Sequence, residues 1–477
     1  MEKFDVIIIG GGPAGLVASK ILVAFGKKTA IVERAKLGGD CTHSGCVPSK
    51  TLLKSAKAVY DAKHLNKYGL NSNTLDIDTS NVLSHVRGVV DEIYAHETPE
   101  VFEKAGVNII EGEATFKSSN EIIVNDKVYQ ASKFIVATGA RASIPNIEGL
   151  KTIAYLTNEN VFLQESIPES MIIIGTGAIG IEMATAFNRL GTKVTLLSRS
   201  TGILKSSDDE LSSILLKQLV VEGIEFINKV KFLKVEENNQ EKLITIEQNG
   251  VQKVLSAQEL LVASGRAPNV NLGLENAQVT YDVKGIKVDE YLKTSNENIY
   301  AIGDVSTQYK FTHIAEQEAI VAASNIGLPI NKKMSYEHIG WCVYSDPELA
   351  QIGLTPKEAD SQYGDEVKTY KLEYKNSDRG YTDVDKVGMI KVSVLNGGRI
   401  VGASILGTRA GELIHQLQLA KTFNISFDKL SKMVYLYPTY SDIIKQPAKN
   451  FYINKLLNNK ALKFLKAAKG FFVGSKS

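Results

Sequence analysis

The strongest constraint on the fold of this chain is a short pattern that occurs twice, at residues 6–15 and at residues 171–182. In each copy, four apolar residues typical of a buried strand run into a glycine-rich turn, and residues typical of a helix follow. A strand, a tight glycine turn and a helix in this order form the phosphate-binding half of a dinucleotide-binding unit. The sequence therefore predicts an α/β fold with two Rossmann-like units.

Each glycine of the first copy has a separate task. Gly10 permits the tight turn, Gly12 lets the backbone approach a pyrophosphate, and Gly15 allows the helix to pack closely on the strand. The next apolar strand, residues 29–32, ends in Glu33, where a carboxylate accepts hydrogen bonds from an adenosine ribose. Strand, turn, helix and acid thus occur in the order that a dinucleotide site requires.

The second copy repeats these glycines, as Gly175, Gly177 and Gly180. At the end of its second strand, however, the ribose-reading position holds Ser198 followed by Arg199 in place of an acid. An acid repels a 2′-phosphate, whereas an arginine binds it with charge-assisted hydrogen bonds. This favours NADPH, with NADH as the alternative if Arg199 is only a solvent-facing side chain near Lys205.

Two of the three cysteines, Cys41 and Cys46, lie in one short loop just after the first nucleotide-binding unit. The pair is close enough in sequence to form a disulfide and to exchange electrons with a bound cofactor. The alternative is a chance pair or half of a zinc site, but zinc needs further ligands and Cys342 stands alone, so no metal site is expected. Reactivity requires the thiolate, which a helix start after Pro48 and the cation of Lys50 would favour.

This loop, residues 37–50, resembles the redox segment of the class I pyridine nucleotide-disulfide oxidoreductases, and the resemblance covers nearly the whole chain. It implies that Cys41 is the interchange thiol and that Cys46 forms a charge-transfer thiolate against a flavin. It also implies that Lys50 lies near the flavin and pairs with Glu182 of the nicotinamide domain. The resemblance assigns to FAD the residues Gly10, Gly12, Pro13, Ala14, Gly15, Glu33, Gly39, Lys50, Thr138, Gly139, Gly303 and Asp304. It assigns to the nicotinamide nucleotide the residues Gly175, Gly177, Gly180, Ser198, Arg199 and Gly265.

Further matches to the family divide the chain into domains. Residues 134–141 and 261–269 resemble the segments where the chain crosses between the nucleotide domains, and residues 299–305 resemble the second flavin motif. The expected arrangement is α/β, with two glutathione reductase-like dinucleotide-binding domains and an α+β dimerisation domain at the C-terminal end. The predicted domains are residues 1–147 for FAD, 148–265 for NAD(P), 266–333 for the second part of the FAD domain and 334–477 for the interface of a homodimer.

One position of the interface domain departs from the better-known members. Dihydrolipoamide dehydrogenase and glutathione reductase have His-Pro-Thr followed by a glutamate, whereas this chain has Tyr437 in place of the histidine and Asp442 in place of the glutamate. A histidine of pKa about 6.5 exchanges protons near neutral pH, whereas tyrosine at about 10 is harder to deprotonate by about 5 kcal/mol. Reactions of dihydrolipoamide or glutathione are therefore expected to be slow.

Mercuric reductase also has tyrosine in this region, and that subgroup is the nearest match. Mercuric reductases, however, carry a cysteine pair near the carboxyl terminus, and this sequence has no cysteine after Cys342. The expected enzyme passes electrons from NAD(P)H through FAD and the Cys41/Cys46 disulfide to a small-molecule acceptor other than mercury, such as a small disulfide or a quinone. The alternatives are a dihydrolipoamide dehydrogenase and a flavin-binding redox sensor with little turnover.

His43, between the two cysteines, replaces the asparagine that better-known members usually carry. One hypothesis is that His43 supplies the proton that Tyr437 cannot. The alternative, which we favour, is that it packs or hydrogen-bonds locally, because a residue inside the cysteine loop need not point toward substrate.

Charge and hydropathy add limits to this interpretation. The formal charge of +2 argues against a nucleic-acid partner, and no apolar run is long enough for a membrane span, so a cytoplasmic protein is expected. The last residues form a basic, amphipathic pattern that either rests on an anionic membrane surface or packs on the dimer. Its lysines are Lys445, Lys449, Lys455, Lys460, Lys463, Lys466, Lys469 and Lys476.

Overall fold

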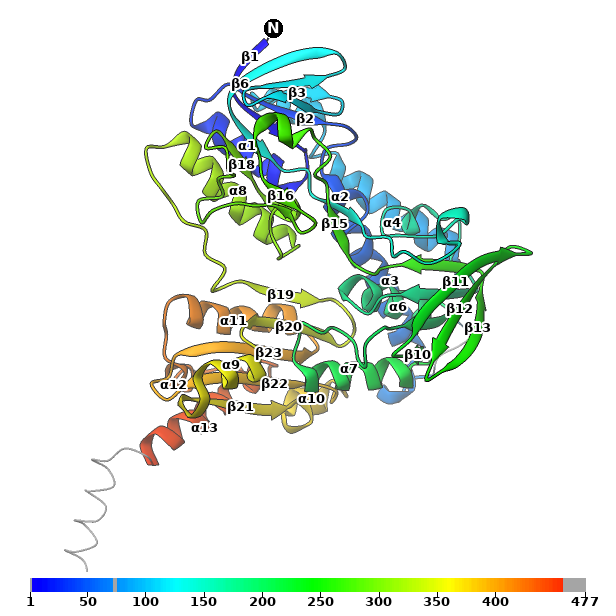
Figure 1. The fold of residues 1–477 in the computed structure, drawn as a ribbon. Coiled ribbons are helices and arrows are strands. Elements are labelled where there is room, and N and C mark those ends of the chain that lie inside the picture. The colour runs from blue at the N-terminus through cyan, green and yellow to red at the C-terminus, as the bar shows by residue number, and fades with distance from the viewer. Residues whose placement is uncertain (1, 72–74, 458–477) are drawn as a thin grey trace, which may run out of the picture. The chain divides into compact units, whose positions relative to one another are not determined.

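The structure is a computed structural model, and it describes residues 2–71 and 75–457 (Figure 1). The chain forms two compact units. The first unit contains Met1–Asp61, Thr74–Thr201 and Gly223–Tyr336. The second unit contains Ala62–Asn73, Gly202–Glu222 and Glu337–Ser477.

The first sheet of the first unit begins with β1, whose end, residues 6–9, is buried. Strand β1 pairs in parallel with β2 on one side and β6 on the other, and a strand from much later in the chain, β18, pairs in parallel with β6. The sheet order is β3-β2-β1-β6-β5-β4. The strands are β1 (Glu2–Ile9), β2 (Thr29–Glu33), β3 (Asn108–Glu111), β4 (Thr115–Ser118), β5 (Glu121–Val124), β6 (Lys127–Val136) and β18 (Ile299–Ala301).

Helices connect or follow these strands, as the glycine turns predict. Helix α1 (Pro13–Ala24) follows the first glycine turn, and α8 (Thr312–Gly327) packs against it. The remaining helices of the N-terminal region are α2 (Gly39–His43), α3 (Cys46–Lys63), α4 (Thr79–Tyr94) and α5 (Pro99–Lys104).

The second glycine turn belongs to a separate parallel sheet of the first unit, in the order β10-β9-β8-β14. Its elements are β8 (Ser170–Ile174), α6 (Ala178–Arg189), β9 (Lys193–Leu197), β10 (Glu225–Ile227) and β14 (Glu259–Val262). An antiparallel sheet of β11 (Lys231–Asn238), β12 (Glu241–Gln248) and β13 (Val251–Ala257) accompanies it. Residues of both sheets share one hydrophobic core.

Two short strands join the segments that the sequence marks as crossings. Strand β7 (Ala140–Ala142) pairs antiparallel with β15 (Arg266–Pro268). A hairpin of β16 (Tyr281–Asp282) and β17 (Gly285–Ile286) follows before the chain returns to β18.

The second unit is built on an antiparallel sheet in the order β19-β20-β23-β22-β21. Its strands are β19 (Gly340–Val343), β20 (Glu348–Gly353), β21 (Val367–Glu373), β22 (Met389–Leu395) and β23 (Ile400–Gly407). Its helices are α7 (Asp209–Val221), α9 (Pro356–Tyr363), α10 (Asp378–Thr382), α11 (Ala410–Thr422), α12 (Phe427–Leu430) and α13 (Asp442–Leu457). Every residue of β23 is buried, because this strand is central and covered on both faces.

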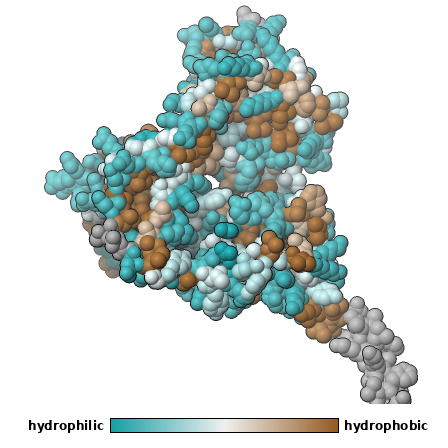
Figure 2. All heavy atoms as spheres, turned by 180° about the vertical axis from the view of Figure 1, so that it is seen from behind, coloured by the Kyte–Doolittle hydropathy of each residue, from teal (hydrophilic) through white to brown (hydrophobic). Residues whose placement is uncertain are grey.

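The predicted fold class is confirmed: each glycine turn follows a strand of a sheet with a parallel core, to which β4 and β5 add antiparallel strands in the first sheet, and the C-terminal unit is α+β. In the described part of the chain, no helix combines the length and the apolar character that a membrane span requires. Hydrophilic residues cover most of the face seen in Figure 2, and apolar residues form separate patches. Most of the predicted basic, amphipathic tail, from Lys460 onward, lies outside the described residues.

Candidate functional site

The first glycine turn forms an open cradle at the N-terminus of α1. A methyl group on Gly15 would lie 2.0 Å from the carbonyl oxygen of Gly10, so only glycine lets the helix pack this closely on the turn. Gly12, in contrast, faces open space, with no atom within 4 Å of an added Cβ. It is the N-cap of α1 and no side chain caps the helix, so the first N–H groups are available to an anion. Pro13 is the first residue of the helix and Ala14 is buried behind it.

Glu33 closes this cradle at the end of β2. Its Oε2 accepts a hydrogen bond of 2.6 Å from the backbone N–H of Gly11, and its Oε1 accepts one of 2.9 Å from Ala35. Gly39 approaches the same turn so closely that an added Cβ would lie 2.9 Å from the Cα of Gly12. The glycine turn, the helix end and the acid fit the pyrophosphate and ribose of FAD.

The second glycine turn has the same geometry at the N-terminus of α6. An added Cβ at Gly180 would lie 2.0 Å from the carbonyl oxygen of Gly175, whereas Gly177 faces open space. Ser198, directly after β9, is buried, with its Oγ 3.3 Å from Thr176 Oγ1. Arg199 is exposed. This turn also fits a dinucleotide, with an exposed cation where the second strand ends.

The two redox cysteines lie on either side of a sharp turn between α2 and α3. Gly45 makes the turn possible, because an added Cβ would lie 2.7 Å from the carbonyl oxygen of Asp40. The predicted helix start after Pro48 is wrong: α3 begins at Cys46, so the sulfur-bearing residue occupies the first position of the helix. The positive end of the helix dipole therefore acts directly on Cys46.

A threonine from α8 contacts both sulfurs. Thr312 Oγ1 lies 3.3 Å from Cys41 Sγ and 3.4 Å from Cys46 Sγ, so its single proton can be donated to whichever sulfur is ionised. The structure has both cysteines as free thiols, the form that the predicted cycle reaches after reduction. A single hydroxyl group thus contacts both members of the reactive pair.

The surroundings separate the proton affinities of the two thiols. A hydrogen bond from Cys41, followed by that of Thr312 and the charge of Lys50, lowers the pKa of Cys46 to about 6 against the opposing effect of burial. The hydrogen bond to Cys46, burial and the negative charge of Glu97 raise the pKa of Cys41 well above its ordinary range. In the reduced pair, Cys46 is therefore the thiolate and Cys41 keeps the proton. This division supports the predicted roles of the two residues.

We expect the reduced, flavin-loaded protein to gain long-wavelength charge-transfer absorbance as the pH rises through about 6, because the Cys46 thiolate forms above its pKa. Below that pH the thiol is protonated and the band is lost. A spectroscopic pH titration under anaerobic conditions measures the midpoint. Thr312→Val removes a hydrogen bond to the thiolate and should move the midpoint upward, whereas Thr312→Ser should not. A midpoint near the ordinary thiol pKa in the unmodified protein would contradict this assignment.

Lys50 lies one turn into α3, and the structure brings it to Glu182 of α6. Lys50 Nζ donates a hydrogen bond of 2.9 Å to Glu182 Oε2. Glu182 is buried, so this ion pair compensates a carboxylate that would be costly to bury alone. The predicted pair is thus present, and it links the two nucleotide-binding sheets next to the cysteines.

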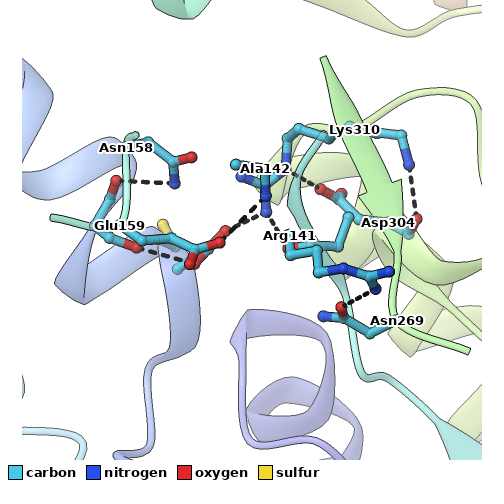
Figure 3. A network of polar contacts seen from close by, with 12 residues as sticks. Arg141, Ala142, Asn158, Glu159, Asn269, Asp304 and Lys310 are labelled. Atoms are coloured by element: carbon cyan, nitrogen blue, oxygen red, sulfur yellow. Dashed lines mark hydrogen bonds and ion pairs between the residues drawn. The ribbon is translucent and has the colours of Figure 1, made fainter. Parts of the chain in front are cut away.

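The predicted second flavin motif carries a half-buried acid with cations beside it. Asp304 Oδ2 lies 3.4 Å from Arg266 Nε. Its backbone carbonyl accepts a hydrogen bond of 2.9 Å from Lys310 Nζ (Figure 3). Burial raises the pKa of Asp304, and Arg266 and Lys310 oppose that shift. Arg266 also pairs with Asp40 of α2. These contacts connect the second flavin motif to the redox loop.

Hydrogen bonds join the two crossing segments, residues 134–141 and 261–269. Thr138 Oγ1 donates a hydrogen bond of 2.7 Å to the carbonyl of Asn269. Arg141 Nη1 donates one of 3.1 Å to Asn269 Oδ1 (Figure 3). Gly139 and Gly265 have φ values of 65° and 140°, which side chains rarely adopt. The predicted glycines therefore sit where the backbone requires them.

The contacts of His43 are with neighbouring residues of the N-terminal region. Its Nε2 donates a hydrogen bond of 2.7 Å to the carbonyl of Leu37, and its ring packs edge-on against Tyr94 at 5.1 Å. These contacts agree with the local packing that the sequence favours for this histidine.

Tyr437 and Asp442 lie in the second unit, and the structure does not pair them by a hydrogen bond. Tyr437 Oη donates a hydrogen bond of 2.9 Å to Oδ2 of Asp378, which is the first residue of α10. Asp442 begins α13, and it contributes only through its charge to the raised pKa of Tyr437. The role of Asp442 at this site stays a prediction, and the carboxylate that contacts the phenol in the structure is Asp378.

Sequence patterns gave no indication of three residues of these sites. Thr312 and Asp378 are described above. Glu318 is fully buried in α8, where it accepts hydrogen bonds of 2.6 Å from the N–H of Gly303 and from Tyr336 Oη, and burial raises its pKa to about 7. Each of the three contacts a residue at least 15 positions away in the sequence, so no local motif identifies them.

Comparison with known families covers most of the chain. The sequence profile described as "Pyridine nucleotide-disulphide oxidoreductase" matches residues 4–319. A second profile, described as "Pyridine nucleotide-disulphide oxidoreductase, dimerisation domain", matches residues 339–448.

Curated relatives include two kinds of enzyme. A mercuric reductase of Bacillus cereus is 32% identical over 445 residues, which cover 93% of this chain and 70% of the relative. A dihydrolipoyl dehydrogenase of Geobacillus stearothermophilus is 32% identical over 453 residues, which cover 93% of this chain and 95% of the relative. Identity therefore does not separate the two activities.

Among solved structures, the chain is similar to a Cu(II) complex of the HOCl-induced flavoprotein disulfide reductase RclA from Escherichia coli. The TM-score is 0.84 at 24% sequence identity, and the match covers 94% of this chain and 100% of the other. At this identity, the likeness concerns the fold.

Proposed function

Because the chain belongs to the pyridine nucleotide-disulphide oxidoreductase family, we propose that it is a homodimeric FAD enzyme that passes electrons from NADPH, through Cys41 and Cys46, to a small-molecule acceptor. The observation that carries this proposal is the unequal pair of thiols. Cys46 has a pKa of about 6 and lies at a helix N-terminus, while Cys41 keeps its proton. Such a pair is suited to alternate between disulfide and dithiol.

The residues present fit each cofactor. When bound, FAD supplies hydride acceptance and two-electron transfer. Reduction of the Cys41–Cys46 disulfide breaks the S–S bond with two electrons and one proton, which leaves Cys46 as thiolate and Cys41 as thiol. Lys50 and Thr312 stabilise that thiolate. When the thiols reduce an acceptor, the disulfide forms again and the two electrons leave with the acceptor.

Tyr437 supports the part of the proposal that concerns the acceptor. The hydrogen bond to Asp378 raises the pKa of this tyrosine above its ordinary value, so it is a poor group for exchanging protons with a dithiol near neutral pH. A mechanism in which histidine takes a thiol proton is thus unsuited to this chain. We therefore favour an acceptor other than dihydrolipoamide or glutathione, such as another small disulfide or a quinone.

An anaerobic titration tests the central proposal. Purified, FAD-loaded protein is titrated with NADPH and, separately, with NADH, while the visible flavin spectrum is recorded and free thiols are counted at the end. A long-wavelength band together with two new thiols per chain is the expected result. Bleaching of the flavin without new thiols would contradict the proposal and favour a flavin reductase or a redox sensor.

Arg199 provides a test of nucleotide preference. We expect Arg199→Glu to lower kcat/KM for NADPH by about 10- to 100-fold, because a carboxylate repels the 2′-phosphate that the guanidinium would bind. NADH lacks that phosphate and serves as the internal control, so its kcat/KM should change little. Steady-state reduction of a dye acceptor with each nucleotide measures both values. An equal loss with both nucleotides would show that Arg199 does not read the phosphate.

A further inference from the structure

The segment that carries Tyr437 is held by helix α10 of the same unit. Two hydrogen bonds join them: Tyr437 Oη to Asp378 Oδ2 at 2.9 Å and Arg379 Nη1 to the carbonyl of Pro438 at 3.4 Å. A third joins Tyr440 Oη to Oδ2 of Asp383, the residue directly after α10, at 3.1 Å. The last two involve residues that follow Tyr437 and Asp378 in the sequence, so they hold the backbone just after Tyr437 to the same region.

Helix α10 is itself firmly attached. Ser377 Oγ accepts a hydrogen bond of 3.2 Å from the N–H of Gly380 and donates one of 2.8 Å to the carbonyl of Tyr374. Tyr374 is fully buried, and its ring lies 5.5 Å from that of Tyr440. Asp378 is thus presented from a short element that is anchored to the core of the second unit.

Packing within the chain does little to order Tyr437. Its side chain is 72% exposed, and the neighbouring Val434 and Leu436 are 98% and 81% exposed. A tyrosine in such surroundings samples several rotamers unless a polar contact selects one. The hydrogen bond of its hydroxyl group to Asp378 makes this selection.

We propose that Asp378, and not Asp442, is the carboxylate that positions Tyr437 for the electron acceptor, which makes α10 part of the acceptor site. This inference rests on the proposed function, in which residues 435–442 serve the acceptor. Asp378 is a positioning residue, because it acts through Tyr437.

The contact has a defined chemical consequence for the phenol. Its O–H group is directed at Asp378, which keeps the phenol protonated and fixes the position of its oxygen. The charged groups that act on this hydroxyl are Asp378, by hydrogen bond and charge, and Asp442, by charge alone. The nearby cation of Arg379 is paired with Asp383 at 2.8 Å. Tyr437 therefore stays protonated and neutral, with its ring and oxygen held in one position.

The first test observes Tyr437 without turnover. In FAD-loaded protein with ring-labelled tyrosine, the Tyr437 NMR signal is assigned as the one that Tyr437→Phe lacks, and its pH midpoint is measured. Asp378→Asn should move the midpoint down toward the ordinary tyrosine value, and Asp442→Asn should move it less. The inference is overturned if Asp378→Asn leaves the midpoint unchanged or if Asp442→Asn moves it equally.

The second test links the contact to the acceptor. With dithiobis(nitrobenzoate) as the probe acceptor, Asp378→Asn should lower kcat about tenfold in the unmodified protein and have no further effect in a Tyr437→Phe background. An equal loss in both backgrounds would show that Asp378 acts on folding and not through Tyr437. Flavin reduction by NADPH should be unchanged in both variants. If reduction or thiol formation fails in the unmodified protein, the proposed function fails and the Tyr437 titration still decides the role of Asp378.

Discussion

Replacing Cys46 with serine is expected to lower turnover with any acceptor on the order of 10³-fold or more, because Cys41 alone cannot form the disulfide. Serine cannot form the disulfide, and its hydroxyl does not ionise near neutral pH. The structure adds a more selective expectation. Cys46, and not Cys41, has the low pKa, so only loss of Cys46 should remove the charge-transfer absorbance.

Cys41→Ser is the matched control for this prediction. It should abolish turnover equally, since no disulfide can form, but it leaves the Cys46 sulfur at the N-terminus of α3. Its visible spectrum should therefore contain the long-wavelength band before any reductant is added. If Cys46→Ser shows that band and Cys41→Ser does not, the two roles are exchanged.

Gly15→Ala is expected to destabilise the flavin-binding part of the protein and to prevent FAD retention. The added methyl group would lie 2.0 Å from the carbonyl oxygen of Gly10, a backbone atom that cannot move without displacing β1 or α1. Overpacking of this kind costs about 1–3 kcal/mol and more where backbone must shift. Thermal unfolding and the ratio of flavin to protein after purification measure the two effects.

Two other glycines separate folding from binding. Gly12→Ala meets no atom within 4 Å, so the apoprotein should unfold at an unchanged temperature while FAD affinity falls, since the methyl group occupies the space that fits the pyrophosphate. Gly88→Ala, in α4, also meets no atom within 4 Å and lies outside the turn. It should be neutral or stabilising by up to about 1 kcal/mol. If Gly12→Ala and Gly15→Ala lowered the unfolding temperature of the apoprotein equally, the assignment of Gly12 to FAD binding and of Gly15 to helix packing would be wrong.

The fold was predictable because its main constraints are local. The glycine turns can be recognised because the strand, the turn and the helix are consecutive in the sequence, and the steric limits on the turn act within about ten residues. Glu33 is found by its distance from that turn, and the cysteine loop by its spacing. The Lys50–Glu182 pair was also predicted, but only through the family resemblance, because nothing local connects α3 to α6.

The start of α3 shows the limit of local reasoning. Pro48 is a good first-turn residue, and from the sequence it suggested a start just beyond it. The structure begins the helix at Cys46, since Gly45 allows a turn sharp enough to place the sulfur at the helix end. A shift of a few residues changes which group receives the helix dipole.

The sequence by itself determined the class of fold, the two nucleotide-binding turns and the pair of redox cysteines, because short-range backbone geometry and spacing specify them. Only the tertiary structure decided which groups tune that chemistry. Thr312 reaches Cys46 across 266 residues of sequence, and Asp378 reaches Tyr437 across 59. Contacts over such separations depend on how sheets and helices pack, and a hydroxyl or a carboxylate brought in this way leaves no pattern in the neighbouring sequence.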